Sequence, residues 1–376
     1  MRAELQGMRT TVPLFATREA LAPLLDRVAA RQRAVLESGR YVLGPEVDAF
    51  EREFAAFVGV RHCVGVANGT EALTIALRAL GVGPGDEVVV PALTFYATAE
   101  AVVNAGARPV FCDIDPHTFT MTAVTAEAAL GERSAALLPV HLFGNPAPMD
   151  ELRELAAARG LRLLEDAAQA AGASLAGRRA GTFGDAAAFS FFPSKNLGGF
   201  GDGGAILSDD DEVAARARRL RAHGSEDRQL HTEVGYNSRL DELQAAGLRV
   251  LLPHLEAWTA ARRRAACAYA EAGLGELVEL PRESDGAESC YHLYVVLSEE
   301  RERLAAGLTA AGVESRAYYS TPLHHQPALQ RYAPEQQLPT AERVAAASLA
   351  LPMGPALAEE QVAAVVAAAR SALGSG

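Results

Sequence analysis

The stretch Phe189-Ser190-Phe191-Phe192-Pro193-Ser194-Lys195-Asn196-Leu197-Gly198-Gly199 is the one around which the rest of the chain is organised. An aromatic and apolar run, which we expect to be buried, ends at Pro193, and a lysine follows it. The glycine-dense segment 199–204 comes next, where the backbone can lie close to a ligand. Lys195 is either a surface side chain whose charged end reaches water or a Schiff-base lysine whose amine loses its proton because burial disfavours the charge. Lys195 is the only lysine in the chain, which favours the second interpretation.

Composition excludes several broad classes of protein. The chain has 376 residues, 49% hydrophobic and 22% charged, as in a globular protein with a sizeable core. Its 35 basic and 47 acidic residues give a net charge of −12, which argues against wide contact with nucleic acid or an anionic membrane. Residues 1–11 lack the apolar core of a signal peptide and no apolar run could span a bilayer, so we expect a cytoplasmic protein. The scattered cysteines indicate reduced thiols without a CxxC pair: Cys63, Cys112, Cys267 and Cys290.

Strands and helices alternate through the first two thirds of the chain. This alternation predicts an α/β fold with a mostly parallel sheet that carries helices on both faces. From about residue 276 the pattern changes to fewer, longer elements, which predicts a smaller C-terminal α+β domain. We therefore expect a large ligand-binding domain over residues 1–250 and a small domain over residues 251–376. The expected elements include helices over 18–38, 97–104, 149–159, 301–311, 341–349 and 359–372, and strands over 62–67, 87–90, 161–164, 205–208 and 289–297.

Four segments that directly follow expected strands carry residues able to bind a ligand. They are Asn68-Gly69-Thr70, Thr94-Phe95, His141 and Asp166. In a parallel sheet, ligands collect beyond the carboxyl ends of the strands, so these segments should share one edge. Asn68-Gly69-Thr70 has two interpretations, an ordinary helix N-cap or backbone amides that bind an anion at the positive end of a helix.

A Schiff-base lysine implies a cofactor with a carbonyl group, and pyridoxal phosphate demands further partners. Its ring nitrogen needs a carboxylate that keeps it protonated, so that the ring can take up electrons when a substrate Cα–H bond breaks. Its phosphate needs a cradle, and its ring needs a flat neighbour. Asp166 fits the first requirement, Gly69 and Thr70 fit the second, and Phe95 fits the third.

The sequence resembles the sugar aminotransferases of the DegT/StrS type, within the fold-type I pyridoxal-phosphate enzymes. The matching segments follow the family's order over nearly the whole chain. They are 38–47, 68–73, 83–88, 94–95, 139–144, 165–169, 190–199, 235–241 and 244–246.

This resemblance implies a role for each matching residue. Lys195 would bind the cofactor covalently and move the proton between the substrate carbon and the cofactor carbon. Asp166 would pair with the ring nitrogen, Gln169 would approach the ring hydroxyl, and Phe95 would stack on the ring. The phosphate would be bound by Gly69, Thr70 and Ser190, together with Asn237 of a partner subunit, which implies a homodimer with shared active sites. The weaker matches for substrate binding are His223, Arg239, Tyr319 and His324.

The resemblance also has departures. Many relatives carry His-Tyr-Pro before the Pro-Leu-His near the C-terminus, whereas here residues 318–324 read YYSTPLH. Since this region borders the sugar site, the change bears on the substrate and leaves the reaction intact. His324-His325 has no ligand at metal-binding spacing, so we expect no metal.

The implied function is transfer of an amine from glutamate or glutamine to a keto carbon of a nucleotide-linked sugar, in amino-sugar biosynthesis. Segments 41–45 and 223–225 favour a 3-keto sugar. Related sugar dehydratases carry histidine where Lys195 stands, so lysine points to aminotransfer. The alternatives are aminotransfer to a keto-inositol and a non-catalytic regulatory protein that contains pyridoxal phosphate.

Overall fold

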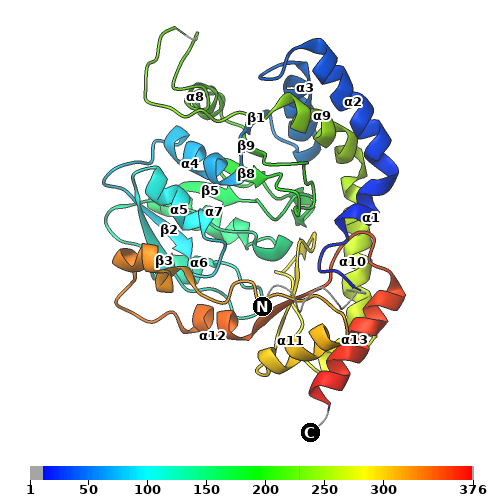
Figure 1. Ribbon diagram of the computed structural model, residues 1–376. Coiled ribbons are helices and arrows are strands. Elements are labelled where there is room, and N and C mark those ends of the chain that lie inside the picture. Colours follow the sequence, from blue (N-terminus) through cyan, green and yellow to red (C-terminus); the bar gives the residue numbers. More distant parts are fainter. Residues whose placement is uncertain (1–11, 228, 375–376) are drawn as a thin grey trace.

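A seven-stranded sheet forms the centre of the computed structural model, which describes residues 12–227 and 229–374 (Figure 1). The strand order is β1-β9-β8-β5-β4-β2-β3, and only β9 runs antiparallel to its two neighbours. The predicted mostly parallel α/β sheet is therefore confirmed. The strands are β1 (His62–Val66), β2 (Glu87–Pro91), β3 (Arg108–Cys112), β4 (Ser134–Leu137), β5 (Arg162–Asp166), β8 (Ala186–Ser190) and β9 (Gly204–Ser208).

Helices cover both faces of this sheet because its strands alternate apolar side chains between two cores. In β2, Val88 and Val90 pack into one buried cluster and Val89 into another. The helices α4 (Gly69–Ala79), α5 (Ala97–Asn104) and α8 (Asp211–Leu220) pack on the first face. The opposite face is covered by α3 (Pro45–Val58), α6 (Ala123–Glu127), α7 (Met149–Arg159) and α9 (Glu242–Leu251).

The aromatic run before Lys195 is divided between the core and the surface. Phe189 and Phe191 point the same way and meet Phe54 edge to face, with ring centroids 5.1 and 5.3 Å apart. Both are buried, whereas Phe192 is 51% exposed. The expectation of a wholly buried run is thus wrong for Phe192, because successive residues of an extended chain point in opposite directions.

Proline divides two long helical segments of the chain. The helix expected over 18–38 is α1 (Thr17–Leu21), η2 (Ala22–Leu24) and α2 (Leu25–Ser38), with Pro23 in the 3-10 turn. It ends as predicted at Gly39, which takes a left-handed φ of +68°. Pro253 likewise lies in η4 (Leu252–His254), between α9 and α10 (Leu255–Glu271).

The C-terminal part contains a two-stranded antiparallel sheet of β11 (Tyr294–Leu297) and β12 (Ser348–Leu351). Helices α10, α11 (Arg301–Ala310) and α13 (Glu359–Leu373) pack around it (Figure 1). The expected strand over 289–297 is shorter, and the expected helix over 341–349 is wrong at its end. That helix, α12 (Pro339–Ala347), stops because Ser348 and Leu349 pair with β11.

Short elements complete the described chain: β6 (Ser174–Leu175), β7 (Arg178–Arg179), β10 (Ala287–Glu288), η3 (Leu142–Gly144), η5 (Leu274–Glu276), η6 (Leu323–His325) and η7 (Pro327–Tyr332). The proposed domain boundary at residue 250 falls in the last turn of α9 and stays a prediction.

All four cysteines are free thiols, and Cys267 is the exposed one. Within the described ranges, no helix has the length and apolar character needed to cross a membrane. Residues 1–11, on which the signal-peptide expectation rests, lie outside the described residues.

Candidate active site

A cavity of about 550 Å³ lies at the carboxyl ends of the central strands. Its wall combines these strand ends with residues 292–293 and 318–319 from the C-terminal part. Eight residues predicted from the sequence meet there. They are Gly69, Thr70, Phe95, Asp166, Gln169, Ser190, Lys195 and Tyr319.

Lys195 is presented to the cavity by a tight turn. Pro193 occupies the second position of this turn, and the Lys195 backbone N–H donates to the Phe192 carbonyl at 2.8 Å. The next residue, Asn196, donates its side-chain N–H to the Cys290 carbonyl at 2.9 Å, which fixes the loop against residues 290–293. Burial lowers the pKa of Lys195 to about 8, with the charge of Asp166 opposing the shift. The amine is still mostly protonated at pH 7, but its unprotonated fraction is far larger than that of an ordinary lysine.

Asp166 ends β5 and points into the same cavity. Its Oδ2 accepts a hydrogen bond from Thr98 at 2.8 Å, and its Oδ1 accepts one from the Ala168 amide at 3.2 Å. The Thr94 hydroxyl lies 3.0 Å from that of Thr98. Burial raises the pKa of Asp166, opposed by the Thr98 hydrogen bond first and then by the Ala168 amide and Lys195. The carboxylate thus has acceptor capacity left for a cationic partner.

The first turn of α4 supplies the other end of the cavity. Asn68 caps this helix, with its side-chain oxygen accepting from the Glu71 amide at 2.9 Å. The Gly69 and Thr70 amides that follow have no intrahelical acceptor, because they lie in the first turn. A Cβ at Gly69 would lie 2.8 Å from Cβ of Ser190, so glycine is needed for this close approach. The N-cap interpretation is correct for Asn68, and it leaves the next two amides free to bind an anion.

The glycines after Lys195 do not border the cavity, contrary to expectation. A Cβ at Gly198 would lie 2.4 Å from the Pro193 carbonyl oxygen, and one at Gly204 would lie 2.4 Å from that of Asn68. These glycines therefore let the loop pack against the protein's own backbone rather than against a ligand.

Aromatic and amide groups form the opposite wall. The Gln169 side chain accepts from the Phe143 amide at 2.6 Å and donates to the Tyr319 hydroxyl at 3.1 Å. Phe95 is 54% exposed, with its ring centroid 5.9 Å from that of Tyr319. A flat ligand could therefore lie against Phe95 while its edge faces Asp166 and Gln169.

Some predicted residues lie outside this cavity. Asn237 and His223 are exposed, and Arg239 donates a hydrogen bond to Asn237. Their predicted roles would require a second subunit and stay predictions. His141 lies at the expected sheet edge, where its backbone N–H donates to the Asp166 carbonyl at 3.1 Å. Its side chain is buried, bonds to Glu165 at 2.9 Å and does not border the cavity.

His324 is also remote from the cavity wall. Its Nε2 lies 3.2 Å from Oε1 of Glu342, and Nε2 of His325 lies 3.7 Å from the same oxygen. The three side chains form a group that could ligate a metal ion. The spacing argument missed Glu342 because it is 18 residues away along the chain. The predicted substrate role of His324 stays a prediction.

Other residues of the site were missed in the sequence. Thr98 lies on α5, four residues after Thr94, which precedes this helix. That spacing could have indicated that the two hydroxyls meet. His292 and Phe15 also border the cavity, but they come from distant parts of the chain without a local motif.

The residues present fit pyridoxal phosphate. One cavity holds a lysine with a depressed pKa, a carboxylate with free acceptor capacity, helix N-terminal amides and an aromatic face. The close approach of Gly69 to Ser190 makes a cradle that a side chain at position 69 would fill.

Comparisons with known proteins give the same result. The model of the DegT/DnrJ/EryC1/StrS aminotransferase family matches residues 25–370. The chain is 46% identical over 364 residues to dTDP-3-amino-3,4,6-trideoxy-alpha-D-glucose transaminase of Streptomyces venezuelae, covering 96% of this chain and 95% of that protein. It is 45% identical over 364 residues to UDP-N-acetyl-3-dehydro-alpha-D-glucosamine 3-aminotransferase of Acidithiobacillus ferrooxidans, covering 97% of this chain and 98% of that protein.

Two further matches bear on function. A "pleiotropic regulatory protein" of Geobacillus stearothermophilus is 45% identical over 354 residues, covering 93% of this chain and 95% of that protein. The crystal structure of S. venezuelae DesV in complex with a ketimine intermediate superposes with a TM-score of 0.93 at 46% identity, covering 96% of this chain and 98% of that one. With the lysine, carboxylate and anion cradle in one cavity, the chain belongs to the DegT/DnrJ/EryC1/StrS family and is a pyridoxal-phosphate-dependent aminotransferase.

Proposed function

We propose that this enzyme moves an amine from glutamate or glutamine to the 3-keto carbon of a nucleotide-linked sugar, in amino-sugar biosynthesis. The observation that carries the proposal is the meeting of Lys195 and Asp166 in one cavity that is large enough for a sugar beside the cofactor. Position 3 is supported by the names of the S. venezuelae and A. ferrooxidans relatives, which both refer to it.

Each wall of the cavity then has a task. Pyridoxal phosphate, when bound, supplies an electron sink for cleavage of the Cα–H bond of the donor. Asp166 holds the proton on the ring nitrogen, and Lys195 Nζ binds the cofactor and later carries the proton between substrate and cofactor carbons. Gly69, Thr70 and Ser190 bind the phosphate, while Phe95 covers the ring and excludes water.

We also propose that the working unit is a homodimer. The wall of the cavity contains no arginine among the described residues, yet a nucleoside diphosphate needs positive charge. Arg239 lies beside the exposed Asn237, and the same segment carries the exposed apolar side chains Leu230 and Val234. Burial of this segment against a second copy would bring Arg239 and Asn237 to the partner's cavity.

A half-reaction tests the transfer step. Holoenzyme mixed with glutamate should lose the absorbance of the lysine-bound cofactor as the cofactor takes the amine. The experiment is repeated with glutamine, and absorbance that stays unchanged with both donors would contradict the proposed donors.

A reverse assay then tests the acceptor. Enzyme and 2-oxoglutarate are incubated with a panel of 3-amino and 4-amino sugar nucleotides and amino-inositols. We expect keto product from the 3-amino sugar nucleotides. Product from amino-inositols alone would support the keto-inositol alternative instead.

A non-catalytic regulatory role is the second candidate, because of the name of the Geobacillus relative. It predicts that the cofactor stays bound and unchanged with every donor and every member of the panel. Multiple turnovers with any pair of substrates would exclude it.

A further inference from the structure

His292 is a buried histidine on the wall of the active cavity without an assigned task. It is 4% exposed and borders the same cavity as Lys195. Its segment is tied to the lysine loop by the Asn196–Cys290 hydrogen bond. Arg262 of α10 donates to the carbonyl oxygens of Tyr291 and His292 at 3.0 and 3.4 Å. The backbone that carries His292 is therefore held at a fixed place beside the lysine loop.

One nitrogen of the His292 imidazole lacks a hydrogen-bond partner within the described residues. Its Nδ1 is fully buried and accepts or donates no hydrogen bond within the described part of the chain, whereas buried polar atoms are normally paired. Burial, with the charges of Lys195 and Arg262, holds the pKa of His292 well below its ordinary value. A neutral imidazole has one nitrogen without a proton, and that nitrogen is a hydrogen-bond acceptor.

Lys195 needs an acceptor in half of the catalytic cycle. Its Nζ is bonded to the cofactor in the pyridoxal form but is free once the cofactor carries the amine. The groups that act electrostatically on Lys195 are Asp166 and Cys290, and Lys195 in turn acts on His292. Asp166 is committed to the ring nitrogen, and burial raises the pKa of the Cys290 thiol to about 12, so that this group stays neutral.

We propose that His292 is a positioning residue that accepts a hydrogen bond from the Lys195 ammonium whenever that amine is not bonded to the cofactor. The inference rests on the assignment of Lys195 as the cofactor-binding lysine. It requires no particular sugar or amino donor.

Because Lys195 is the only lysine, an amine-selective reagent reports on a single side chain. Full-length enzyme is loaded with pyridoxamine phosphate, which leaves Nζ free, and is labelled with trace acetic anhydride across a pH range that brackets 8. Mass spectrometry of the peptide that contains Lys195 separates its labelling from that of the chain's α-amine. The pH dependence of the rate gives the pKa of Lys195.

Removing the acceptor should disfavour the ammonium form. We expect His292→Leu and His292→Phe to lower the pKa of Lys195 by roughly 0.5 to 1 and to speed labelling below that pKa. His292→Asn keeps an acceptor oxygen and should restore the pKa in large part. Thermal unfolding shows which variants are folded, and the two apolar variants together keep the test decisive if one is not.

His324→Leu is the matched control. His324 is also 4% exposed with an unpaired buried Nδ1, but it lies beside Glu342 away from the cavity wall. It should leave the pKa of Lys195 unchanged. An unchanged or raised pKa in the folded His292 variants would overturn the proposal. Since no substrate is present, that result would leave the proposed aminotransfer untouched.

Discussion

Glu165 and Asp166 are neighbours in β5 with opposite surroundings. Glu165 is fully buried, and its two oxygens accept amide hydrogen bonds from Gly181, Phe183 and Gly184, each at 2.7 Å. A fourth hydrogen bond comes from His141 Nε2 at 2.9 Å. The Ala147 amide donates to Nδ1 of the same ring, so the proton must be on Nε2. Every lone pair of Glu165 is used within the protein.

Asp166 is 5% exposed and, from the residues that the structure describes, receives only the Thr98 and Ala168 hydrogen bonds. Burial raises its pKa because these two donors compensate the lost hydration only in part. One carboxylate thus fixes a loop, while its neighbour has capacity left for a ligand. Counting the donors on a buried carboxylate separates the structural group from the functional one.

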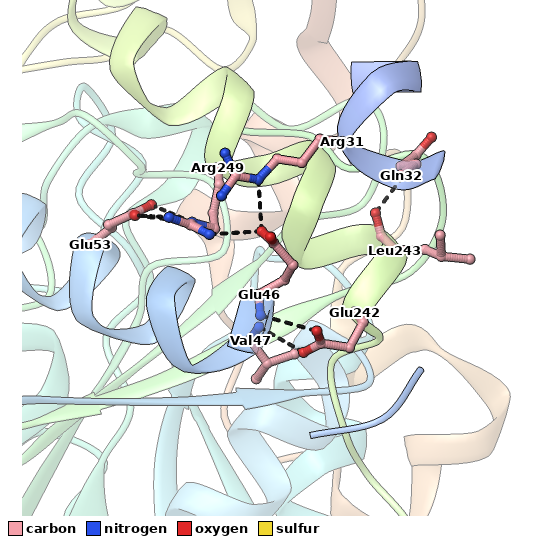
Figure 2. A network of polar contacts seen from close by, with 8 residues as sticks. All are labelled: Arg31, Gln32, Glu46, Val47, Glu53, Glu242, Leu243 and Arg249. Carbon is pink, nitrogen blue, oxygen red and sulfur yellow. Dashed lines mark hydrogen bonds and ion pairs between the residues drawn. The ribbon is translucent and has the colours of Figure 1, made fainter. Parts of the chain in front are cut away.

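Glu242 extends the comparison to a second structural carboxylate. It is 1% exposed and accepts a hydrogen bond from the Gly44 amide at 2.9 Å. Two more come from the Glu46 and Val47 amides at 3.0 and 2.8 Å, at the start of α3 (Figure 2). Arg249 of the same helix as Glu242 binds Glu46 at 2.8 Å (Figure 2). Glu242 thus has three donors from the protein, one fewer than Glu165 and one more than Asp166, and it does not border the cavity.

The largest effect should follow from Asp166→Asn. The amide cannot hold the ring nitrogen's proton, so we expect the rate of the glutamate half-reaction to fall about 10²- to 10³-fold. The free energy of unfolding of the cofactor-free variant should be about 1 kcal/mol higher than that of cofactor-free wild type, because an incompletely paired buried charge is removed.

The pH dependence of this difference follows from the raised pKa. In the folded state Asp166 binds its proton more tightly than in the unfolded state, where the ordinary value is 3.8. Cofactor-free wild-type protein should therefore lose stability as pH rises from that value through the folded-state pKa, and Asp166→Asn should not show this part of the loss. If Asp166→Asn loses stability as well as turnover, Asp166 has a structural role like that of Glu165.

Glu165→Gln should have the opposite profile. A glutamine amide turns one acceptor into a donor that faces the Gly181 and His141 donors or the Phe183 and Gly184 amides. We expect the free energy of unfolding to fall by about 3–5 kcal/mol in denaturant titrations. The fraction that stays folded should turn over within a few-fold of wild type. The exposed Glu256, paired with Arg179, offers a control in which Glu256→Gln changes stability by about 0.5 kcal/mol at most.

The sequence predicted most of this architecture for physical reasons. The helices expected over 97–104 and 149–159 match α5 and α7 to the residue. Gly39 ends α2 and Gly160 ends α7, both in the left-handed conformation. Lys195 and Asp166 could be predicted because their segments follow strands and matched a known family. Local pattern was enough for these features.

Contacts between distant segments could not be predicted in this way. His141 looked like a ligand residue at a strand end. Its bond to Glu165 shows that it helps to hold the loop over residues 181–184 instead. His292 and Thr98 border or support the cavity through packing of segments that lie far apart in the chain. The α12 boundary was missed because pairing of Ser348 with Leu297 overrides helical propensity.

Glu242→Gln tests whether the number of protein donors on a buried carboxylate predicts a structural role. Three amides at the N-terminus of α3 would lose a charged acceptor, so we expect stability to fall by about 2 kcal/mol with turnover retained. Glu53→Gln is the control, since Glu53 meets Arg249 at a site that is 41% exposed and should cost about 0.5 kcal/mol. Loss of turnover beyond the loss of folded protein would mean that α9 transmits more than stability to the active site.

Thr98→Val should have the smallest effect, and it probes how the protein tunes the functional carboxylate. Valine keeps the shape of threonine but removes the hydroxyl that donates to Asp166 Oδ2. The ionised carboxylate loses a donor, so the pKa of Asp166 should rise further and its grip on the ring nitrogen should weaken by about 1 kcal/mol. This corresponds to a cofactor dissociation constant about five-fold higher, measured by absorbance titration of cofactor-free protein. Thr98→Ser retains the hydroxyl and should bind as wild type does. Equal binding by the valine variant would mean that the Ala168 amide and Lys195 suffice to keep Asp166 ionised, and that Thr98 orders α5 rather than the carboxylate.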